Sequence, residues 1–192
     1  GEYDLCVYVR DGKHQSAGSY DDCTGYKGYQ LISISGARQL TFGETTHDRP
    51  SLIYANGGYL LAYQSWERGS YYVGDIFLKR FDSNWNQIQK VRATDETAYE
   101  DTPSVIYTGG YYYLPYVSDE TGNFDIFVNK YDSNLNLVEI HQLTTSSADQ
   151  DRPSLICVGN NFYLAYQSWE NGPSSVSYTH LRAHETPEHL VC

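Results

Sequence analysis

The sequence has no methionine, and its 13 lysine and arginine residues are far outnumbered by 24 aspartate and glutamate residues, which gives a formal net charge of −11. A nucleic-acid-binding surface needs a basic stripe that displaces counterions, and the shortage of cations excludes one. No run of apolar residues approaches the roughly 18 needed to cross a membrane, and no apolar leader follows the first residues. We therefore expect no membrane insertion, and we interpret the chain, which lacks an initiator methionine, as an internal fragment.

Cysteine is also scarce, with four residues in the chain. Cys6 and Cys23 could close a loop by a disulfide in an oxidising compartment, but the sequence does not fix their state. Cys157 occupies a position that is apolar in a related segment, so we expect a buried, unreactive thiol there. By contrast, 20 tyrosines and 16 glycines are typical of short strands and tight turns.

The C-terminal segment 176–192 lacks the tyrosine-rich, alternating character of the residues before it. Written as codons, Val176 to Thr186 resembles one reading frame of the transposase adapter used in sequencing libraries, and His189 to Cys192 fits the stretch beyond the adapter index. We predict that this tail is not native. The alternative is a divergent last strand. The spacing of the tail histidines is accordingly not interpreted as a metal site.

One segment of twenty residues occurs twice with few changes. DRPSLIYANGGYLLAYQSWE runs from Asp48 to Glu67, and DRPSLICVGNNFYLAYQSWE runs from Asp151 to Glu170. A more divergent copy lies between them, and the three copies align on Pro50, Pro103 and Pro153, which are 53 and then 50 residues apart. A period near 50 residues is typical of propellers and other repeat folds.

Each full copy predicts four short antiparallel strands, which in the first are residues 51–55, 59–65, 75–81 and 87–93. The turn sequences NGG and DSNWN separate them. Four antiparallel strands repeated at this period make a propeller blade. The predicted fold is all-β, a fragment of a β-propeller with four-stranded antiparallel blades, about two of them complete and two partial.

The predicted domain organisation follows the repeat. Residues 1–48 form a partial blade with two outer strands and an insertion, residues 49–101 and 102–151 form complete blades, residues 152–175 form the two inner strands of another blade, and residues 176–192 are the non-native tail. A closed ring needs about four to eight blades. The remaining blades of a parent propeller are therefore expected partners of this chain.

The repeat resembles that of the TolB-like propellers over Asp4 to Glu170. The residues that carry the resemblance are a QLT strand end, an Asp before x-Pro-Ser, a glycine-bearing first turn, an LAYxS strand and the DIF that opens the third strand. The family's usual SPDG turn is replaced here by YANGG, YTGG and CVGNN. The resemblance implies a blade architecture rather than an activity. The first and second strands are also similar to those of sialidase and glycosidase propellers, but the S-x-D-x-G-x-T-W turn of those propellers is absent from this sequence.

Charged and aromatic residues gather where strands of a blade meet. In an antiparallel blade the first strand begins where the second ends and the third begins, so these residues are predicted to share one face. Indoles stack on apolar ring faces and arginine forks onto carboxylates, which predicts a platform for a sugar or a peptide. The candidate ligand-binding residues are Asp48, Arg49, Trp66, Glu67, Asp101, Asp119, Glu120, Asp151, Arg152, Trp169 and Glu170.

The same positions have a structural interpretation, because they recur from copy to copy. The Asp before x-Pro can accept backbone N–H bonds and fix a turn, and we expect a structural turn role for Asp75, Asp125, Asp82 and Asp132 as well. In the middle copy Thr102 and Asp119 replace the arginine and the tryptophan. Binding sites often arise where a repeat departs from its own consensus, so both interpretations of the arginines and tryptophans stay open.

The sequence assigns no catalytic residue, no cofactor and no metal site. No Ser, Cys or His has a visible triad partner, and glycoside hydrolysis needs two carboxylates about 5 to 10 Å apart, a distance that sequence does not supply. The acidic segments SADQD and SDETGNFD leave a loosely held Ca²⁺ as an alternative, but neither matches a defined calcium loop.

Two functions fit these observations. The first, which we expect, is a noncatalytic binding or scaffold module that recognises a protein or a glycan on the face carrying the D-R-P and S-W-E ends. The alternative is a fragment of a propeller hydrolase of the glycosidase or sialidase type. The tyrosine-rich, acidic composition favours an extracellular or periplasmic location.

Overall fold

The computed structural model describes residues 3–5, 32–34, 38–42, 46–66, 74–94, 98–159, 161–170 and 178–184, with the backbone alone for the first two ranges and the last. The chain divides into two compact units, Gly1–Gly43 and Glu44–Cys192. In the first unit, β1 (Tyr3–Leu5) pairs antiparallel with β2 (Ile32–Ile34), within the two regions where outer strands of a partial blade are expected. The predicted insertion, Cys6 and Cys23 lie outside the described residues.

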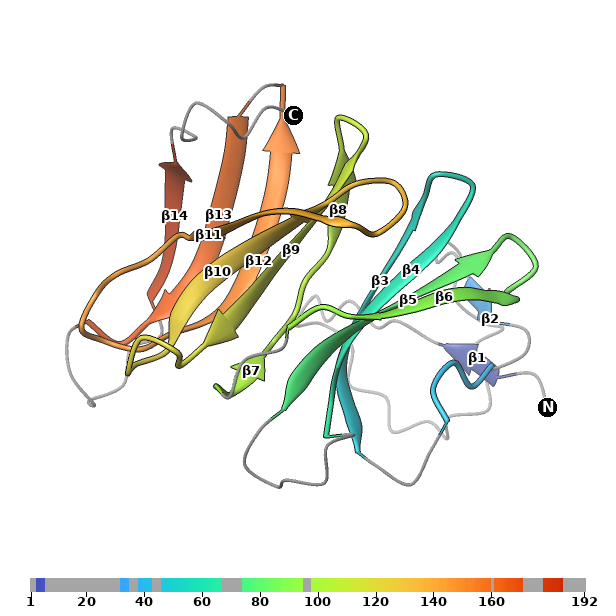
Figure 1. Ribbon diagram of the computed structural model, residues 1–192, viewed down its shortest axis with the longest axis horizontal. Helices are drawn as coiled ribbons and strands as arrows, with labels where there is room; N and C mark the ends of the chain where they lie inside the picture. The colour runs from blue at the N-terminus through green and yellow to red at the C-terminus, as the bar shows by residue number, and fades with distance from the viewer. Residues whose placement is uncertain are drawn as a thin grey trace, which may run out of the picture. The chain divides into compact units, whose positions relative to one another are not determined.

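Three antiparallel sheets make up the second unit (Figure 1). Blade I consists of β3 (His47–Ala55), β4 (Gly58–Ser65), β5 (Asp75–Asp82) and β6 (Gln87–Arg92). Blade II consists of β7 (Glu100–Asp101) and β8 (Ile106–Thr108), which both pair with β9 (Tyr111–Ser118), followed by β10 (Asp125–Tyr131) and β11 (Leu137–Gln142). Blade III consists of β12 (Gln150–Val158), β13 (Asn161–Ser168) and β14 (Tyr178–His184). The predicted all-β fold with four-stranded antiparallel blades is confirmed. In the ranges described, no helix could span a membrane.

The outer strand β14 lies within the predicted non-native tail. Its backbone pairs antiparallel with β13, from Phe162 opposite His184 to Ser168 opposite Tyr178, which is the position of the third strand of a blade. Main-chain hydrogen bonds to a strand edge place few demands on side-chain identity. The foreign origin of residues 176–192 therefore stays a prediction, which sequencing the parent gene beyond codon 175 would test.

The innermost strand of each blade is interrupted at the same repeat position. The register shifts between Asp48 and Ser51 in β3, and between Asp151 and Ser154 in β12, while in blade II the interruption separates β7 from β8. The residue after each Asp has a left-handed backbone, with φ of 50° at Arg49, 45° at Thr102 and 53° at Arg152. Such conformations cost free energy for residues other than glycine, so the repeat holds them with specific contacts.

Turn chemistry sets the ends of the hairpins. Asn56 and Gly57 have φ of 51° and 76°, the two positive values that a tight hairpin turn of type I′ requires. At the C-terminal end of β5 and directly after β10, Asp82 and Asp132 each accept backbone N–H bonds from the residues two and four positions later, at 2.8 to 2.9 Å. A side-chain hydrogen bond, from Asn86 to Asp82 and from Asn136 to Asp132, lowers the pKa of each aspartate most, and the backbone bonds lower it further. Both aspartates thus bind the backbone of the turn that follows their strand.

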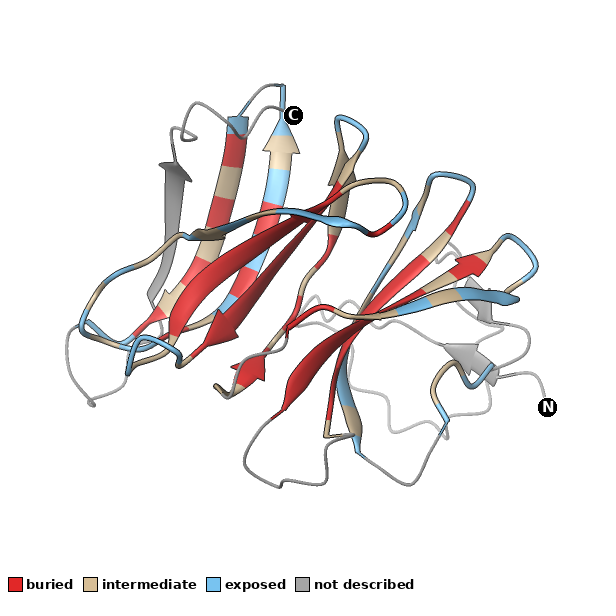
Figure 2. Cartoon of the chain, in the orientation of Figure 1, coloured by how far each residue is buried: buried red, intermediate tan, exposed pale blue. Residues whose placement is uncertain are grey.

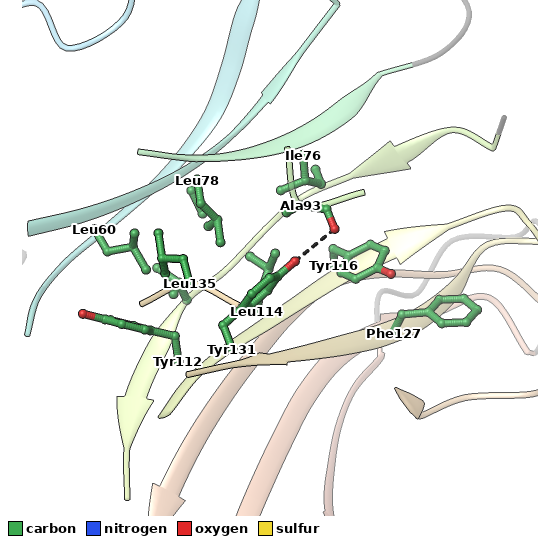
Figure 3. Packing of buried hydrophobic residues seen from close by; sticks show 12 residues of the cluster. Leu60, Ile76, Leu78, Ala93, Tyr112, Leu114, Tyr116, Phe127, Tyr131 and Leu135 are labelled. Atoms are coloured by element: carbon green, nitrogen blue, oxygen red, sulfur yellow. Dashed lines mark hydrogen bonds between the residues drawn. The ribbon is translucent and has the colours of Figure 1, made fainter. Parts of the chain in front are cut away.

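The hydrophobic core lies between blades. Strands β4, β5, β9 and β10 are buried along nearly their whole length, as Figure 2 shows, polar residues such as Lys79 and Asn129 included. One cluster joins Leu60, Ile76 and Leu78 of blade I to Leu114 and Tyr131 of blade II (Figure 3). A second cluster joins blades II and III.

Tyrosine fills much of this core because its hydroxyl finds polar partners. The Tyr131 hydroxyl donates to the Ala93 carbonyl at 3.0 Å, and the Tyr116 hydroxyl donates to Asn129 Oδ1 at 3.2 Å. Burial raises the pKa of Tyr131 to about 12. A buried aromatic ring with a satisfied hydroxyl contributes apolar area without leaving a polar group unpaired.

The expectation for Cys157 is corrected. Its side chain is half-buried rather than buried, and it is disulfide-bonded, so it is not a free thiol. The partner cysteine lies outside the described residues. The strand alternation correctly placed Cys157 on β12 but could not reveal its oxidation state.

Candidate functional site

The predicted site residues come together at one end of each blade. Pairing places His47 opposite Ser65 and Ser65 opposite Asp75 in blade I. In blade II both Glu100 and Asp125 lie opposite Ser118, and in blade III Gln150 lies opposite Ser168. The starts of the first and third strands and the end of the second therefore share one end of the blade, as antiparallel order requires.

Each Asp before x-Pro stabilises the left-handed residue that follows it. The Oδ1 atoms of Asp48, Asp101 and Asp151 accept the N–H of the next residue at 2.7, 2.6 and 2.7 Å. This contact is the same in all three blades. It gives the aspartates a structural contact through one oxygen each.

The residue after each Asp also reaches toward the next blade. Arg49 forms an ion pair with Asp101 across the junction of blades I and II, hereafter junction I–II. At junction II–III, Thr102 Oγ1 donates to Asp151 Oδ1 at 3.1 Å instead. The two junctions therefore have the same architecture, with a charged contact in one and a neutral donor in the other.

A pocket of about 510 Å³ opens at junction II–III. Three predicted site residues line it, namely Asp101, Asp151 and Trp169. The other lining residues are Val117, Phe124, Ser147, Ala148, Asp149 and Gln150. Its volume falls within the range of small-molecule sites, which is about 300 to 1,000 Å³.

The pocket combines aromatic surface with hydrogen-bond acceptors. The Trp169 side chain is large and 40% exposed. Gln150 is fully buried, and its Oε1 atom has no hydrogen-bond partner among the described residues. Asp149 Oδ1 accepts the Phe124 N–H at 3.1 Å, which ties the strand entering blade III to blade II. Apolar surface with a few acceptors suits a ligand rich in hydroxyl groups.

The other predicted residues do not line this pocket. Asp119 Oδ1 accepts the Tyr99 N–H at 2.8 Å, which is a structural contact. Glu120 and Glu170 are exposed, and Trp66, at the same repeat position as Trp169, is half-buried. The Arg152 side chain is 75% exposed, with its Nε 3.7 Å from Asp151 Oδ2. Glu67 lies outside the described residues.

The aspartates that open the third strands lie deeper. Asp75 is fully buried, and its Oδ1 accepts Arg92 Nη2 at 2.5 Å. Asp125 is 2% exposed and accepts side-chain bonds from Thr121, Gln142 and Thr144 at 2.8 to 3.0 Å. Both serve structure, but their partners are side chains rather than the backbone N–H groups expected from the sequence.

Glu100 is a buried acid that the sequence did not single out. It is 1% exposed, and its Oε2 accepts Thr94 Oγ1 at 3.2 Å in junction I–II. Burial raises its pKa to about 8, with the charges of Asp75 and Glu120 adding to the shift and the Thr94 bond and Arg92 opposing it. The corresponding residue of blade III is the neutral Gln150.

Two pocket residues that were not predicted from the sequence differ from their counterparts in the preceding copy of the repeat. Position by position, Phe124 replaces Gly74, and Asp149 replaces Tyr99. These departures from the repeat fall at the pocket. Among the described residues, no group of three or more His, Cys, Asp or Glu side chains is arranged to hold a metal ion.

Comparisons with known proteins bear on the fold. No protein-family model matches the sequence, and no curated protein matches it either, so the TolB-like resemblance has no support from them. The structure is similar to that of an α-L-arabinofuranosidase from Lactobacillus brevis, with a TM-score of 0.57 and 13% identity over 80% of this chain and 56% of that one. It is similar also to a thermostable family-43 glycoside hydrolase, with a TM-score of 0.53 and 11% identity over 79% of this chain and 57% of that one.

The chain has a β-propeller fold similar to that of glycoside hydrolases. It spans just over half the length of each of these two enzymes. At such low identity the likeness concerns the fold and transfers no activity.

Proposed function

We propose that this propeller binds a glycan in the pocket at junction II–III. The observation that carries the proposal is the meeting of Trp169, Asp101 and Asp151 in one pocket of about 510 Å³. The indole offers an apolar face to a sugar ring, and carboxylate oxygens accept bonds from its hydroxyl groups. The fold likeness to glycosidases supports a carbohydrate ligand over a peptide.

The chain offers a matched pair of variants for testing glycan binding. Trp169→Ala is expected to weaken binding about tenfold or more, because removing a central aromatic anchor costs at least about 1 to 2 kcal/mol. Trp66→Ala, at the same repeat position but outside the pocket, should leave affinity unchanged. Isothermal titration with neutral pentose and hexose oligosaccharides measures both. Equal affinity in the two variants and the native chain would refute the stacking of a sugar ring on Trp169.

Hydrolysis is a second candidate, favoured by the fold of the two similar enzymes. Three carboxylates, those of Asp101, Asp149 and Asp151, line the pocket, and a hydrolase of this kind needs a pair of them. Asp151→Asn is then expected to lower hydrolysis of a bound glycoside at least about 100-fold while Asp48→Asn, at the same repeat position in blade I, does not. Release of reducing sugar measures the rate. Binding without any hydrolysis by the native chain would limit the function to recognition.

A further inference from the structure

Thr102 stands where the neighbouring copies of the repeat carry arginine. Arg49, Thr102 and Arg152 share one backbone geometry: φ lies between 45° and 53°, the N–H donates to the preceding Asp, and a proline follows. The side chain of residue 102 therefore leaves the backbone in the direction of junction II–III, as the Arg49 side chain leaves it in the direction of junction I–II.

The two junctions differ in what that side chain does. Arg49 pairs with Asp101 and neutralises it. Thr102 donates one hydrogen bond to Asp151 but brings no charge. Within the described part of the chain, no cation from blade II pairs with Asp151, and the cation of its own blade, the 75% exposed Arg152 side chain, lies with its Nε 3.7 Å from Asp151 Oδ2. The pocket is found at this junction, with Asp151 in its lining.

We infer that Thr102, which does not line the pocket itself but contacts its lining residue Asp151, determines the specificity of the pocket. Its short side chain leaves junction II–III open. Asp151 Oδ1 already accepts Thr102 Oγ1 and the Arg152 N–H, so Oδ2, with Arg152 Nε at 3.7 Å, is the oxygen that would accept ligand hydroxyl groups. An arginine on the backbone of residue 102 would fill the space and pair with that carboxylate. Gln150 also lines the pocket; it is fully buried, and its Oε1 atom lacks a partner among the described residues. The inference deepens the proposed glycan binding and rests on it for the identity of the ligand.

The first test is a substitution that restores the repeat. T102R is expected to weaken binding of the neutral oligosaccharide that the native chain binds best by about 100-fold, because a filled pocket excludes the ligand. T102S keeps the hydroxyl and should retain most of the affinity. Undiminished affinity in a folded T102R protein would overturn the inference. If T102R does not fold, T102Q supplies a long neutral side chain for the same measurement.

The second test needs no ligand. In thermal unfolding, the midpoints of T102R, D151N and T102R/D151N should be non-additive, because the introduced guanidinium pairs with Asp151 only when the carboxylate is present. Additive midpoints would overturn the inference even if a glycan binds. Non-additive midpoints together with no binding of any oligosaccharide by the native chain would refute the proposed function and still support the role of Thr102 at the junction.

Discussion

At pH 8 the Glu100→Gln variant is expected to be more stable than the native chain by about 2 to 4 kcal/mol, and the difference should vanish near pH 4.5. The reason is the buried carboxyl at junction I–II, whose pKa is raised from 4.5 to about 8, chiefly by burial. The folded chain therefore keeps a proton that the unfolded chain releases. The contribution of the protonated Glu100 side chain to the free energy of unfolding is fully present below about pH 4.5 and is lost as the pH rises through about 8.

The charges around Glu100 come from several elements. Asp75 lies on β5, Arg92 on β6 and Glu120 after β9, while Tyr116 on β9 has its own pKa raised by burial and by the two glutamates. Glutamine preserves the shape of the protonated acid and cannot ionise, as Gln150 shows at the same position of blade III.

Urea unfolding of both proteins between pH 4.5 and 8 measures the effect. As the pH rises, the free energy of unfolding of the native chain should fall relative to that of the variant, by up to about 1.4 kcal/mol per pH unit. Glu120→Gln, which changes an exposed acid close by, is the control and should leave the slope in place. Parallel curves for the native chain and Glu100→Gln would show that Glu100 is already ionised in the folded state.

The second large effect is expected from Arg92→Met, which should lower the free energy of unfolding by about 3 to 5 kcal/mol at pH 7. Arg92 pairs with Asp75, a side chain with no exposed surface. Removing the guanidinium leaves a buried carboxylate without its cation. The loss comes from that unpaired charge rather than from the packing of the arginine stem.

Two further variants separate charge from packing. Arg92→Met combined with Asp75→Asn should recover most of the lost stability, since the buried carboxylate charge is then removed together with its cation. Arg92→Gln should fall between, because Gln142, its counterpart in blade II, donates to Asp125 at 3.0 Å. Chemical unfolding measures all three proteins. A single Arg92→Met variant as stable as the native chain would contradict the electrostatic account of this junction.

The repeat made the fold predictable from the sequence. The spacing of Pro50, Pro103 and Pro153, with turn sequences between apolar segments, located the strands of blades I and II to within a few residues. Strand order then placed the charged ends of the repeat together, because antiparallel pairing leaves no other arrangement. The left-handed backbone at Arg49, Thr102 and Arg152 gave no such signal, since it depends on Asp contacts that a residue pattern does not display.

The site was predictable only in part, because equivalent residues of the repeat lie at different junctions between blades, and the residue type does not reveal which junction holds the pocket. Trp66 and Trp169 occupy one repeat position, yet only Trp169 lines the pocket at junction II–III. At junction I–II the position that corresponds to Trp169 is held by Asp119 of blade II. Glu100 could not be identified from the sequence, because its pKa is raised by burial and that burial arises from packing between blades. The substitution of Thr102 was visible in the sequence, but its consequence required the geometry of the junction.

Nuclear magnetic resonance of the three tryptophan indole N–H groups offers the most direct test of the ligand site. Trp169 lines the pocket, Trp66 holds the same repeat position in blade I, and Trp85 stacks on Tyr59 at 3.7 Å at the opposite end of that blade. Titration with the neutral oligosaccharides should shift the Trp169 signal and leave those of Trp66 and Trp85 in place. A shift of the Trp66 signal with Trp169 unmoved would contradict a glycan site at junction II–III.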